Sequence, residues 1–475
     1  MLPTIATGNV ASALAGEYEV ANSLRFDDGS TDYLSISGST PDNRKKFTYS
    51  FWFKRSHLGT DQVLLSYESD SNNRGQIQIN SSDQLRYFER SGGSTTTDLV
   101  TNRLFRDVSA WYSIIISVDT SQGTDTNRVK IYVNGVQETS FATSTYPSQN
   151  YDTNANGTYA KNIGRRNVNT DFYLDGYLTE VVFIDGTQQA NTDLGEFDSD
   201  TNIWKPKDVS GLTFGTNGFY LDFENSGSLG ADVSGNGNNF TVNNLTSIDQ
   251  TTDTCTNNFA TFNPLFPTAG TSAFSEGNLK LVASGSAGSG LSSFGISKGK
   301  WYMEVKQTAV NEPLGNGESG ICVVGDPTGN LGNVEGTAFA YGIRNHNGTK
   351  FENASSSTSW HGNWTAGDII SVALDMDNHR VYFAKNGQYA DGSGNWDEAF
   401  TGSPAYLSLS TAKTDYFLAM SQLHSSATET YELNFGSPSF SISSGNSDAD
   451  GYGNFEYSVP SGYYALNSKN LAEYG

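Results

Sequence analysis

Two stretches of this sequence share one pattern of residues. The first, WYSIIISVDTSQGTDTNRVKIYVNG, runs from Trp111 to Gly135, and the second, WTAGDIISVALDMDNHRVYFAKNG, runs from Trp364 to Gly387. Each begins with a tryptophan, continues as an apolar run that ends on an aspartate, and passes through a polar turn into an alternating run that ends on Asn-Gly. The repetition predicts two separate β domains built on one plan. It also favours surface recognition over catalysis.

Alternation within the first stretch predicts an antiparallel hairpin. Apolar residues recur at every second position, as a half-buried strand requires. This stretch ends on Asn134-Gly135, a pair that suits a tight turn in which both residues take positive φ. The alternating apolar positions are Ile114, Ile116 and Val118 on one strand and Val129, Ile131 and Val133 on its partner.

The composition is that of an all-β chain. It holds 25 Tyr, 27 Phe and 7 Trp, and only 17% of its residues are charged. Short runs of Val, Ile, Tyr, Phe and Thr lie between clusters of Asn, Asp, Gly and Ser, which is the pattern of strands and turns. At 475 residues, a prior of roughly 150 residues per domain allows about three units.

The net charge of −23 argues against nucleic acid as a partner, because phosphate binding needs clustered Lys and Arg. It also disfavours docking on anionic membranes, and its simplest role is solubility. No window approaches the run of about 20 apolar residues that spans a bilayer, so we expect no membrane insertion. The first residues lack the basic region and long apolar core of a signal peptide.

Changes in composition and apolar patterning along the sequence divide the chain into five segments. Residues 1–20 are small and weakly patterned and predict an N-terminal arm. Residues 21–190 and 257–445 hold the strand patterns of two sandwiches. Residues 191–256 predict a loop-rich connector that contributes one strand to a neighbour. Residues 446–475 are too aromatic for a free tail, so this C-terminal segment is expected to pack against another part of the protein.

Two cysteines do not make a disulfide framework. Cys322 lies in the apolar run GICVVG and is interpreted as a small buried hydrophobe, whereas Cys255 lies in a polar segment. The alternative is a single bridge between them.

No residues with the spacing of a catalytic or metal site stand out. A retaining glycosidase needs two carboxylates about 5 Å apart. The nearest candidate, Glu196-Phe-Asp198-Ser-Asp200, lacks a second glutamate at the appropriate spacing and reads as a solvated acidic loop. No nucleophile elbow or phosphate loop is visible. We therefore predict no enzyme activity and no cofactor. The histidines show no metal-ligand spacing; they are His57, His346, His361, His379 and His424.

Residues 20–190 resemble a laminin-G-like or concanavalin-A-like lectin sandwich. The resemblance depends on SLRFDDGSTDYLSI, FTYSFWFKRS, WYSIIISVD with VKIYVNG, and FYLDGYLTEVVFIDG, which occur in the order of the family. Some laminin-G-like domains bind calcium at the sandwich rim, and Asp27, Asp28 and Asp175 could line such a site, since calcium takes oxygen ligands. Ordinary turn chemistry is the preferred interpretation, so no metal site is predicted.

The second half resembles a SPRY (B30.2-type) domain. The matching segments are GKWYMEV at 299–305, GICVVGD at 320–326, AYGI at 340–343, the second repeated stretch, PAYLSL at 404–409 and ELNFGSPSF at 432–440. SPRY domains share the sandwich plan, which accounts for the repeated hairpin. The two resemblances imply two concanavalin-A-like antiparallel β-sandwich (jelly-roll) domains in tandem.

Aromatic residues are the candidates for ligand binding. Loops at the rim of a SPRY sandwich hold the partners of that family, and Trp360, His361 and Trp396 lie in polar loop sequence. Tyr and Trp rings stack against sugars and fill peptide pockets. The alternative is that these three residues pack within their loops. Four tryptophans inside strand patterns are predicted to be core residues: Trp52, Trp111, Trp301 and Trp364.

The pairing of these domains, with LGADVSGNGNNFTVNN between them and DGYGNFEYSVPSGYYALNSKNLAEYG at the end, resembles structural proteins of marine bacteriophages. This resemblance implies a non-enzymatic protein on the phage particle surface, such as a tail fibre, spike or capsid fibre. Its expected partners are other virion proteins, contacted through the N-terminal arm, and a host-surface glycan or protein. A homo-oligomer is expected, a trimer before other states. The alternative is a purely structural virion protein; a carbohydrate-active enzyme is a third possibility.

Overall fold

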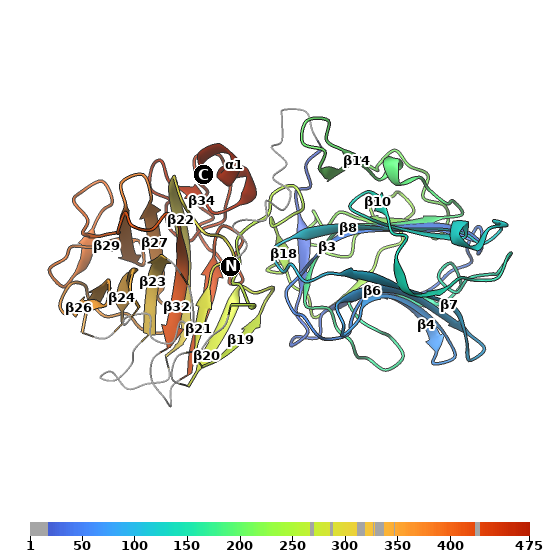
Figure 1. The fold of residues 1–475 in the computed structure, drawn as a ribbon, viewed down its shortest axis with the longest axis horizontal. Coiled ribbons are helices and arrows are strands. Elements are labelled where there is room, and N and C mark those ends of the chain that lie inside the picture. Colours follow the sequence, from blue (N-terminus) through green and yellow to red (C-terminus); the bar gives the residue numbers. More distant parts are fainter. Residues whose placement is uncertain are drawn as a thin grey trace. The chain divides into compact units, whose positions relative to one another are not determined.

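The computed structural model describes residues 18–266, 270–285, 288–310, 319–325, 327, 337–345, 347–422 and 428–475. The chain divides into two compact units, and the boundary between them in the sequence lies between Asn258 and Phe259. Almost every regular element of the described chain is a β-strand (Figure 1), which confirms the all-β class. The predicted N-terminal arm lies outside the described residues, apart from positions 18–20.

Two sheets build the first unit (Figure 1). In the β3 sheet the strand order is β10 (Val136–Gln137), β9 (Val129–Val133), β8 (Trp111–Asp119), β3 (Lys46–Arg55), β13 (Gly176–Asp185), β1 (Ser23–Phe26) and β18 (Gln250–Thr251), with β16 (Phe219–Leu221) paired to β13. In the β6 sheet it is β11 (Phe141–Thr145), β7 (Ser94–Leu104), β6 (Gln84–Ser91), β5 (Asn73–Ile79), β4 (Gln62–Asp70), β12 (Ala160–Ile163), β2 (Tyr33–Ile36) and β17 (Thr241–Asn243).

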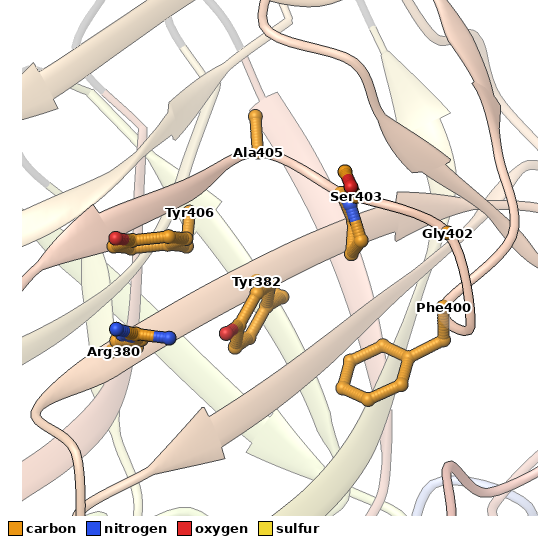
Figure 2. Close-up of a pocket in the computed structure, with 8 residues that line it drawn as sticks. Arg380, Tyr382, Phe400, Gly402, Ser403, Ala405 and Tyr406 are labelled. Atoms are coloured by element: carbon orange, nitrogen blue, oxygen red, sulfur yellow. The ribbon is translucent and has the colours of Figure 1, made fainter.

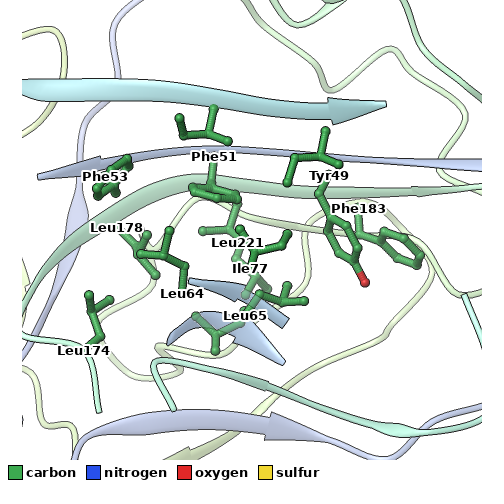
Figure 3. Packing of buried hydrophobic residues seen from close by; sticks show 14 of the residues in the cluster. Tyr49, Phe51, Phe53, Leu64, Leu65, Ile77, Leu174, Leu178, Phe183 and Leu221 are labelled. Atoms are coloured by element: carbon green, nitrogen blue, oxygen red, sulfur yellow. The ribbon is translucent and has the colours of Figure 1, made fainter. Parts of the chain in front are cut away.

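The core of the first unit lies between these two sheets. Figure 3 shows Phe51 and Phe53 of β3 packed with Leu65 of β4 and Ile77 of β5. Successive residues of a strand point to opposite faces of its sheet, so each sheet supplies every second side chain to this cluster. The remaining side chains of the β6 sheet face away from the core.

The predicted hairpin is the pair β8 and β9. The register aligns Ile114 with Val133. The predicted Asn-Gly turn follows β9 and joins it to β10, and its residues have φ values of 47° at Asn134 and 75° at Gly135. Both values lie in the left-handed region that a tight Asn-Gly turn requires. The four predicted core tryptophans are all buried.

The predicted connector belongs to the first unit. Its residues supply β16, β17 and β18, three strands instead of the single strand expected, and a hairpin of β14 (Gly195–Phe197) with β15 (Trp204–Pro206). Trp204 and Phe214 pack with Trp52 and Trp111 in a second, smaller hydrophobic cluster. Alternation did not reveal these strands, because the apolar residues of this polar segment show no period, although Trp204, Phe214 and Phe219 are buried. Short 3-10 turns are η1 (Asp125–Asn127) and η2 (Asn191–Asp193).

The second unit also contains two sheets (Figure 1). The β22 sheet follows β19 (Thr271–Ser275), β20 (Lys280–Ser284), β33 (Thr428–Asn434), β22 (Lys300–Val310), β27 (Ile369–Asp375), β28 (Arg380–Lys385), β29 (Gln388–Ala390) and β30 (Trp396–Glu398), with β31 (Tyr406–Ser408) on β28 and β34 (Tyr464–Ala465) on β22. The β23 sheet follows β21 (Ser289–Leu291), β32 (Tyr416–Gln422), β23 (Ser319–Gly325), β24 (Ala340–Arg344), β25 (Thr349–Glu352) and β26 (Ser355–Ser357).

The C-terminal segment packs on the second unit, as expected from its aromatic content. Strand β34 pairs in parallel with β22, and the buried Phe455 ring meets Tyr302 edge-on at 5.0 Å. The buried Glu304 carboxylate accepts hydrogen bonds from the backbone N–H groups of Glu456 at 3.0 Å and Tyr457 at 2.8 Å. A helix, α1 (Ser468–Tyr474), follows. It is short, and the described residues contain no helix long and apolar enough for a membrane crossing.

Both cysteines are free and buried. The interpretation of Cys322 as a small buried hydrophobe is therefore confirmed, and the alternative of a bridge to Cys255 is not what the structure contains.

Candidate functional site

The structure places the three predicted loop aromatics together, against the core of the second unit. Trp360 is 7% exposed and His361 is 2% exposed, while Trp396 is half-buried. The His361 ring lies 4.8 Å from the Trp396 ring. Hydrogen bonds fix both rings, because Nε1 of Trp396 donates to the Gly362 carbonyl at 2.5 Å and the His361 ring nitrogens contact the Gly362 and Thr349 carbonyls.

These contacts are those of residues that hold a loop in place. Burial lowers the pKa of His361, since the charged imidazolium loses solvation. Side chains as buried as Trp360 and His361 offer little surface to a ligand. The alternative of loop packing is therefore the one that the geometry favours.

An open pocket lies elsewhere on the same unit, with a volume of about 600 Å³. Strand β28 supplies Arg380 and Tyr382, strand β31 supplies Tyr406, and the preceding loop supplies Phe400 (Figure 2). Pairing aligns Tyr382 of β28 with Tyr406 of β31. The other lining residues are Gly402, Ser403, Pro404 and Ala405.

Aromatic rings and one guanidinium define the chemistry of this pocket. The Arg380 guanidinium lies 4.4 Å from the centre of the Tyr406 ring, which is 40% exposed. Tyr382 meets Phe400 edge-on at 5.3 Å and lies 5.6 Å from Tyr406. A hydrogen bond to Tyr382 raises the pKa of Arg380 above its already high value, so the guanidinium carries its charge at any physiological pH.

Such a pocket suits recognition, because its lining combines aromatic rings with a positive charge. Its volume falls within the roughly 300–1,000 Å³ typical of small-ligand sites. Tyr and Arg are enriched among residues that dominate binding energy, and a tyrosine ring also stacks on a sugar face. The lining contains neither a carboxylate nor a histidine.

The sequence contained a signal for this pocket that our prediction did not use. Arg380 and Tyr382 occupy the polar face of the second repeated hairpin, and Tyr406 lies in the PAYLSL segment. Alternation shows that Arg380 and Tyr382 share a face. It does not show that β31 lies beside β28, because that pairing is a tertiary contact between separated segments.

Another cluster lies in the first unit, where oxygen or nitrogen atoms of Asp28, His57 and Asp175 all lie within 4.8 Å of one another. The fold thus unites two of the aspartates considered for calcium with a histidine that sequence spacing did not connect to them. Asp175 already accepts a 2.6 Å hydrogen bond from Ser56 Oγ and lies 3.9 Å from His57 Nδ1. Burial raises the pKa of Asp28, with the Asp27 charge as a further cause.

This donor set fits calcium poorly. Calcium takes six to eight oxygen ligands, whereas an imidazole suits transition metals. The hydrogen bond from Ser56 and the contact with His57 indicate that Asp175 holds neighbouring loops together. We therefore assign this cluster no metal.

The acidic loop at Glu196 has the solvated character predicted for it. Glu196 pairs with Lys205 and Lys207, each at 3.7 Å. Hydrogen bonds from Thr201 hold the pKa of Asp198 well below its usual range. A general acid in glycoside hydrolysis needs a raised pKa, so this loop lacks that property.

The folds of both units and the character of the pocket define a protein built from domains of ligand-recognition classes. Residues 28–191 match the family described as the concanavalin A-like lectin/glucanases superfamily, in its laminin G branch, and residues 300–403 match the SPRY domain family. The chain thus carries a concanavalin A-like domain followed by a SPRY domain, as predicted. Lectin-like and SPRY domains are typically non-catalytic binding modules.

Solved structures of both kinds are similar to this chain. The SPRY domain of human HERC1 is 20% identical, with 36% of this chain and 96% of that chain covered and a TM-score of 0.29. Domains LG4-5 of the mouse laminin alpha1 chain are 11% identical, with 96% and 90% covered and a TM-score of 0.29. A heptameric SAP-like pentraxin from Limulus polyphemus is 12% identical, with 37% and 81% covered and a TM-score of 0.28.

None of the curated proteins compared with the sequence matches it significantly. The resemblance to bacteriophage structural proteins therefore stays a prediction.

Proposed function

We propose that this chain is a non-enzymatic recognition protein that binds a glycan or protein on a cell surface through the pocket of its SPRY domain. The observation that carries the proposal is the exposed Tyr406 ring backed by the Arg380 guanidinium. The guanidinium lies over one face of this ring, and the ring is 40% exposed, so part of its surface is available to stack on a partner. The pocket thus presents an aromatic surface next to a fixed positive charge.

The proposal includes a place on a virion surface. It is supported by the resemblance of the whole sequence to marine bacteriophage structural proteins. On a particle, a homo-oligomer would present many copies of the pocket, so weak individual contacts would combine into avid binding. The N-terminal arm and other virion proteins remain its proposed means of attachment.

Binding of the purified chain to host cells and to a glycan array tests the proposal. Replacing Tyr406 by alanine removes the exposed ring and its contact with Tyr382 and leaves the buried residues of the second unit in place, so the fold should persist. Truncating such a central aromatic residue typically costs 2 kcal/mol or more, which corresponds to roughly a thirtyfold loss of affinity. We expect a loss of that order for Tyr406→Ala and a smaller loss for Arg380→Ala.

Phe197→Ala is the matched control, because Phe197 is 43% exposed and lies in the first unit. It should bind as the parent chain does. If Tyr406→Ala also binds normally, or if the parent chain binds no host surface, the structural-protein alternative is preferred.

A further inference from the structure

A lysine, an asparagine and an aspartate meet inside the first unit. The Nζ atom of Lys54 lies 2.8 Å from Oδ1 of Asn258 and 2.8 Å from Oδ2 of Asp253. The lysine belongs to β3, whereas the other two residues follow β18 in the chain. The fold therefore brings a primary amine into contact with a carboxylate and a carboxamide that are 199 and 204 residues further along the sequence.

Strand pairing fixes the position of the lysine. Lys54 lies opposite Trp111 of β8 and opposite Tyr177 of β13, so the three side chains share one face of the sheet. The centre of the Tyr177 ring lies 5.4 Å from Lys54 Nζ. The indole N–H of Trp111 donates to Oδ1 of Asp253 at 3.1 Å. Two aromatic side chains thus hold the amine and the carboxylate in place.

The group of three is closed to solvent. Lys54 and Asp253 are each 1% exposed, and Asn258 is 6% exposed. The Asn258 amide is also fixed, because its Nδ2 donates to the Ser109 carbonyl at 2.6 Å. Such enclosure keeps out the water that would compete with the amine for the carboxamide carbon. It also removes the solvation that favours the charged forms of the amine and the carboxylate, so a proton can pass between them.

The amine nitrogen lies near the carbon that it would attack. A carbonyl bond is about 1.23 Å long, so Cγ of Asn258 lies no more than about 4 Å from Lys54 Nζ. Holding two reacting atoms roughly 3–3.5 Å apart gives a reaction within one molecule a large advantage in rate. A lysine amine becomes a nucleophile when an adjacent base takes its proton, and Asp253 is that base here.

We propose that Lys54 and Asn258 form an intramolecular isopeptide bond, with Asp253 as the catalytic acid and base. The Lys54 ammonium gives a proton to the Asp253 carboxylate, and the neutral amine attacks Cγ of Asn258. The Asp253 carboxylic acid then protonates the departing Nδ2. The Nζ–Cγ bond forms, and the Cγ–Nδ2 bond breaks. The second proton of the amine passes through Asp253 to the released ammonia, so the products are a secondary amide and an ammonium ion.

The bond would fasten the first unit at the point where the chain leaves it. Asn258 is the last residue of this unit, and Lys54 lies on the central strand β3. Tension applied beyond residue 258 would then load a covalent bond instead of the hydrogen bonds between strands. The site is independent of the SPRY pocket.

Mass spectrometry of the intact purified chain tests the proposal. We expect a mass below that of the sequence by one ammonia molecule. Digestion should yield a branched peptide that joins Lys54 to Asn258, and trypsin should not cleave between Lys54 and Arg55. An Asn-Gly pair that forms a succinimide also loses ammonia, but its product is a linear peptide, so peptide mapping separates the two reactions.

Variants assign the roles of the residues. Lys54→Arg keeps a positive charge beside Asp253 but removes the nucleophile, so this variant should show the full mass. Asp253→Asn should leave most of the chain without the bond. Lys46→Arg, at the start of the same strand, is the matched control and should lose ammonia as the parent chain does. Circular dichroism shows that each variant is folded, and the parent should unfold at a higher temperature than Lys54→Arg, because a cross-link constrains the unfolded chain.

A folded parent chain of full mass would overturn the proposal. Ammonia loss confined to linear peptides, or a branched peptide that persists in Lys54→Arg, would do the same. Tyr406→Ala should form the bond normally, so this reaction and the SPRY pocket can fail separately.

Discussion

At the scale of single residues, glycines in the left-handed region show how close the packing is. Gly135 and Gly59 have φ values of 75° and 76°. A Cβ added at Gly135 would lie 2.1 Å from an atom of the Trp204 ring, whereas a Cβ at Gly59 would meet nothing within 4 Å. Gly59 therefore tests backbone strain alone, whereas Gly135 tests backbone strain together with steric overlap.

Replacing each glycine by alanine measures these two costs. Gly59→Ala should lower the free energy of unfolding by about 1 kcal/mol, the cost of placing a Cβ in the left-handed region. Gly135→Ala should cost about 1–3 kcal/mol more, because overpacking forces Trp204 to shift. Urea unfolding of the two variants provides the comparison, and equal losses would show that Trp204 moves freely.

Glu180 gives the first unit a dependence on pH. It has a φ of 52° at a bulge in β13, and it accepts hydrogen bonds from Tyr18 Oη at 3.0 Å and Tyr220 Oη at 2.9 Å. Burial raises its pKa from 4.5 to about 7. The folded state therefore binds more protons than the unfolded state between these two values, and the free energy of unfolding falls as pH rises through this window.

Glu180→Gln should remove this dependence, because the amide does not ionise. The parent chain should lose about 3 kcal/mol between pH 4.5 and 7 through this carboxyl group, and the variant should show a correspondingly smaller decrease. Urea unfolding at pH 5 and pH 8 measures both. A parent and a variant with the same pH slope would show that Glu180 titrates normally when folded.

At the scale of elements, the sequence predicted strands and hairpins well, but it did not show which distant strands lie side by side. The hairpins of β8 with β9 and β27 with β28 follow from alternation, and both are present. The Asn-Gly pairs form the next turns, which join β9 to β10 and β28 to β29. The pocket depends on β31 lying beside β28. Alternation within a strand does not reveal this adjacency, so the predicted site residues came from loop sequence, where Trp360 and His361 are in fact buried.

The C-terminal segment is an element whose contribution can be measured. Phe455 is fully buried against Tyr302, and removing a buried phenylalanine side chain typically costs about 3–5 kcal/mol. Phe455→Ala should destabilise the second unit by that amount and make residues 441–463 the first site of limited proteolysis. If the variant resists protease as the parent does, the segment is held mainly by its hydrogen bonds to Glu304.

At the scale of the whole molecule, the chain consists of two units with separate hydrophobic cores. Each core is enclosed by strands of its own unit, including the connector strands in the first and the C-terminal strand in the second. Fragments 18–258 and 259–475 should therefore each fold. Cooperative thermal unfolding of each fragment checks this expectation, and a fragment without a cooperative transition would contradict it.

The most direct test of a recognition protein is equilibrium binding of the intact chain to a panel of neutral, carboxylated and sulfated glycans, followed by sizing of the recovered glycans. Recognition without catalysis predicts saturable binding of at least one glycan and its recovery at full length. Shortened glycans would contradict it, as would the absence of binding both across this panel and to host cells.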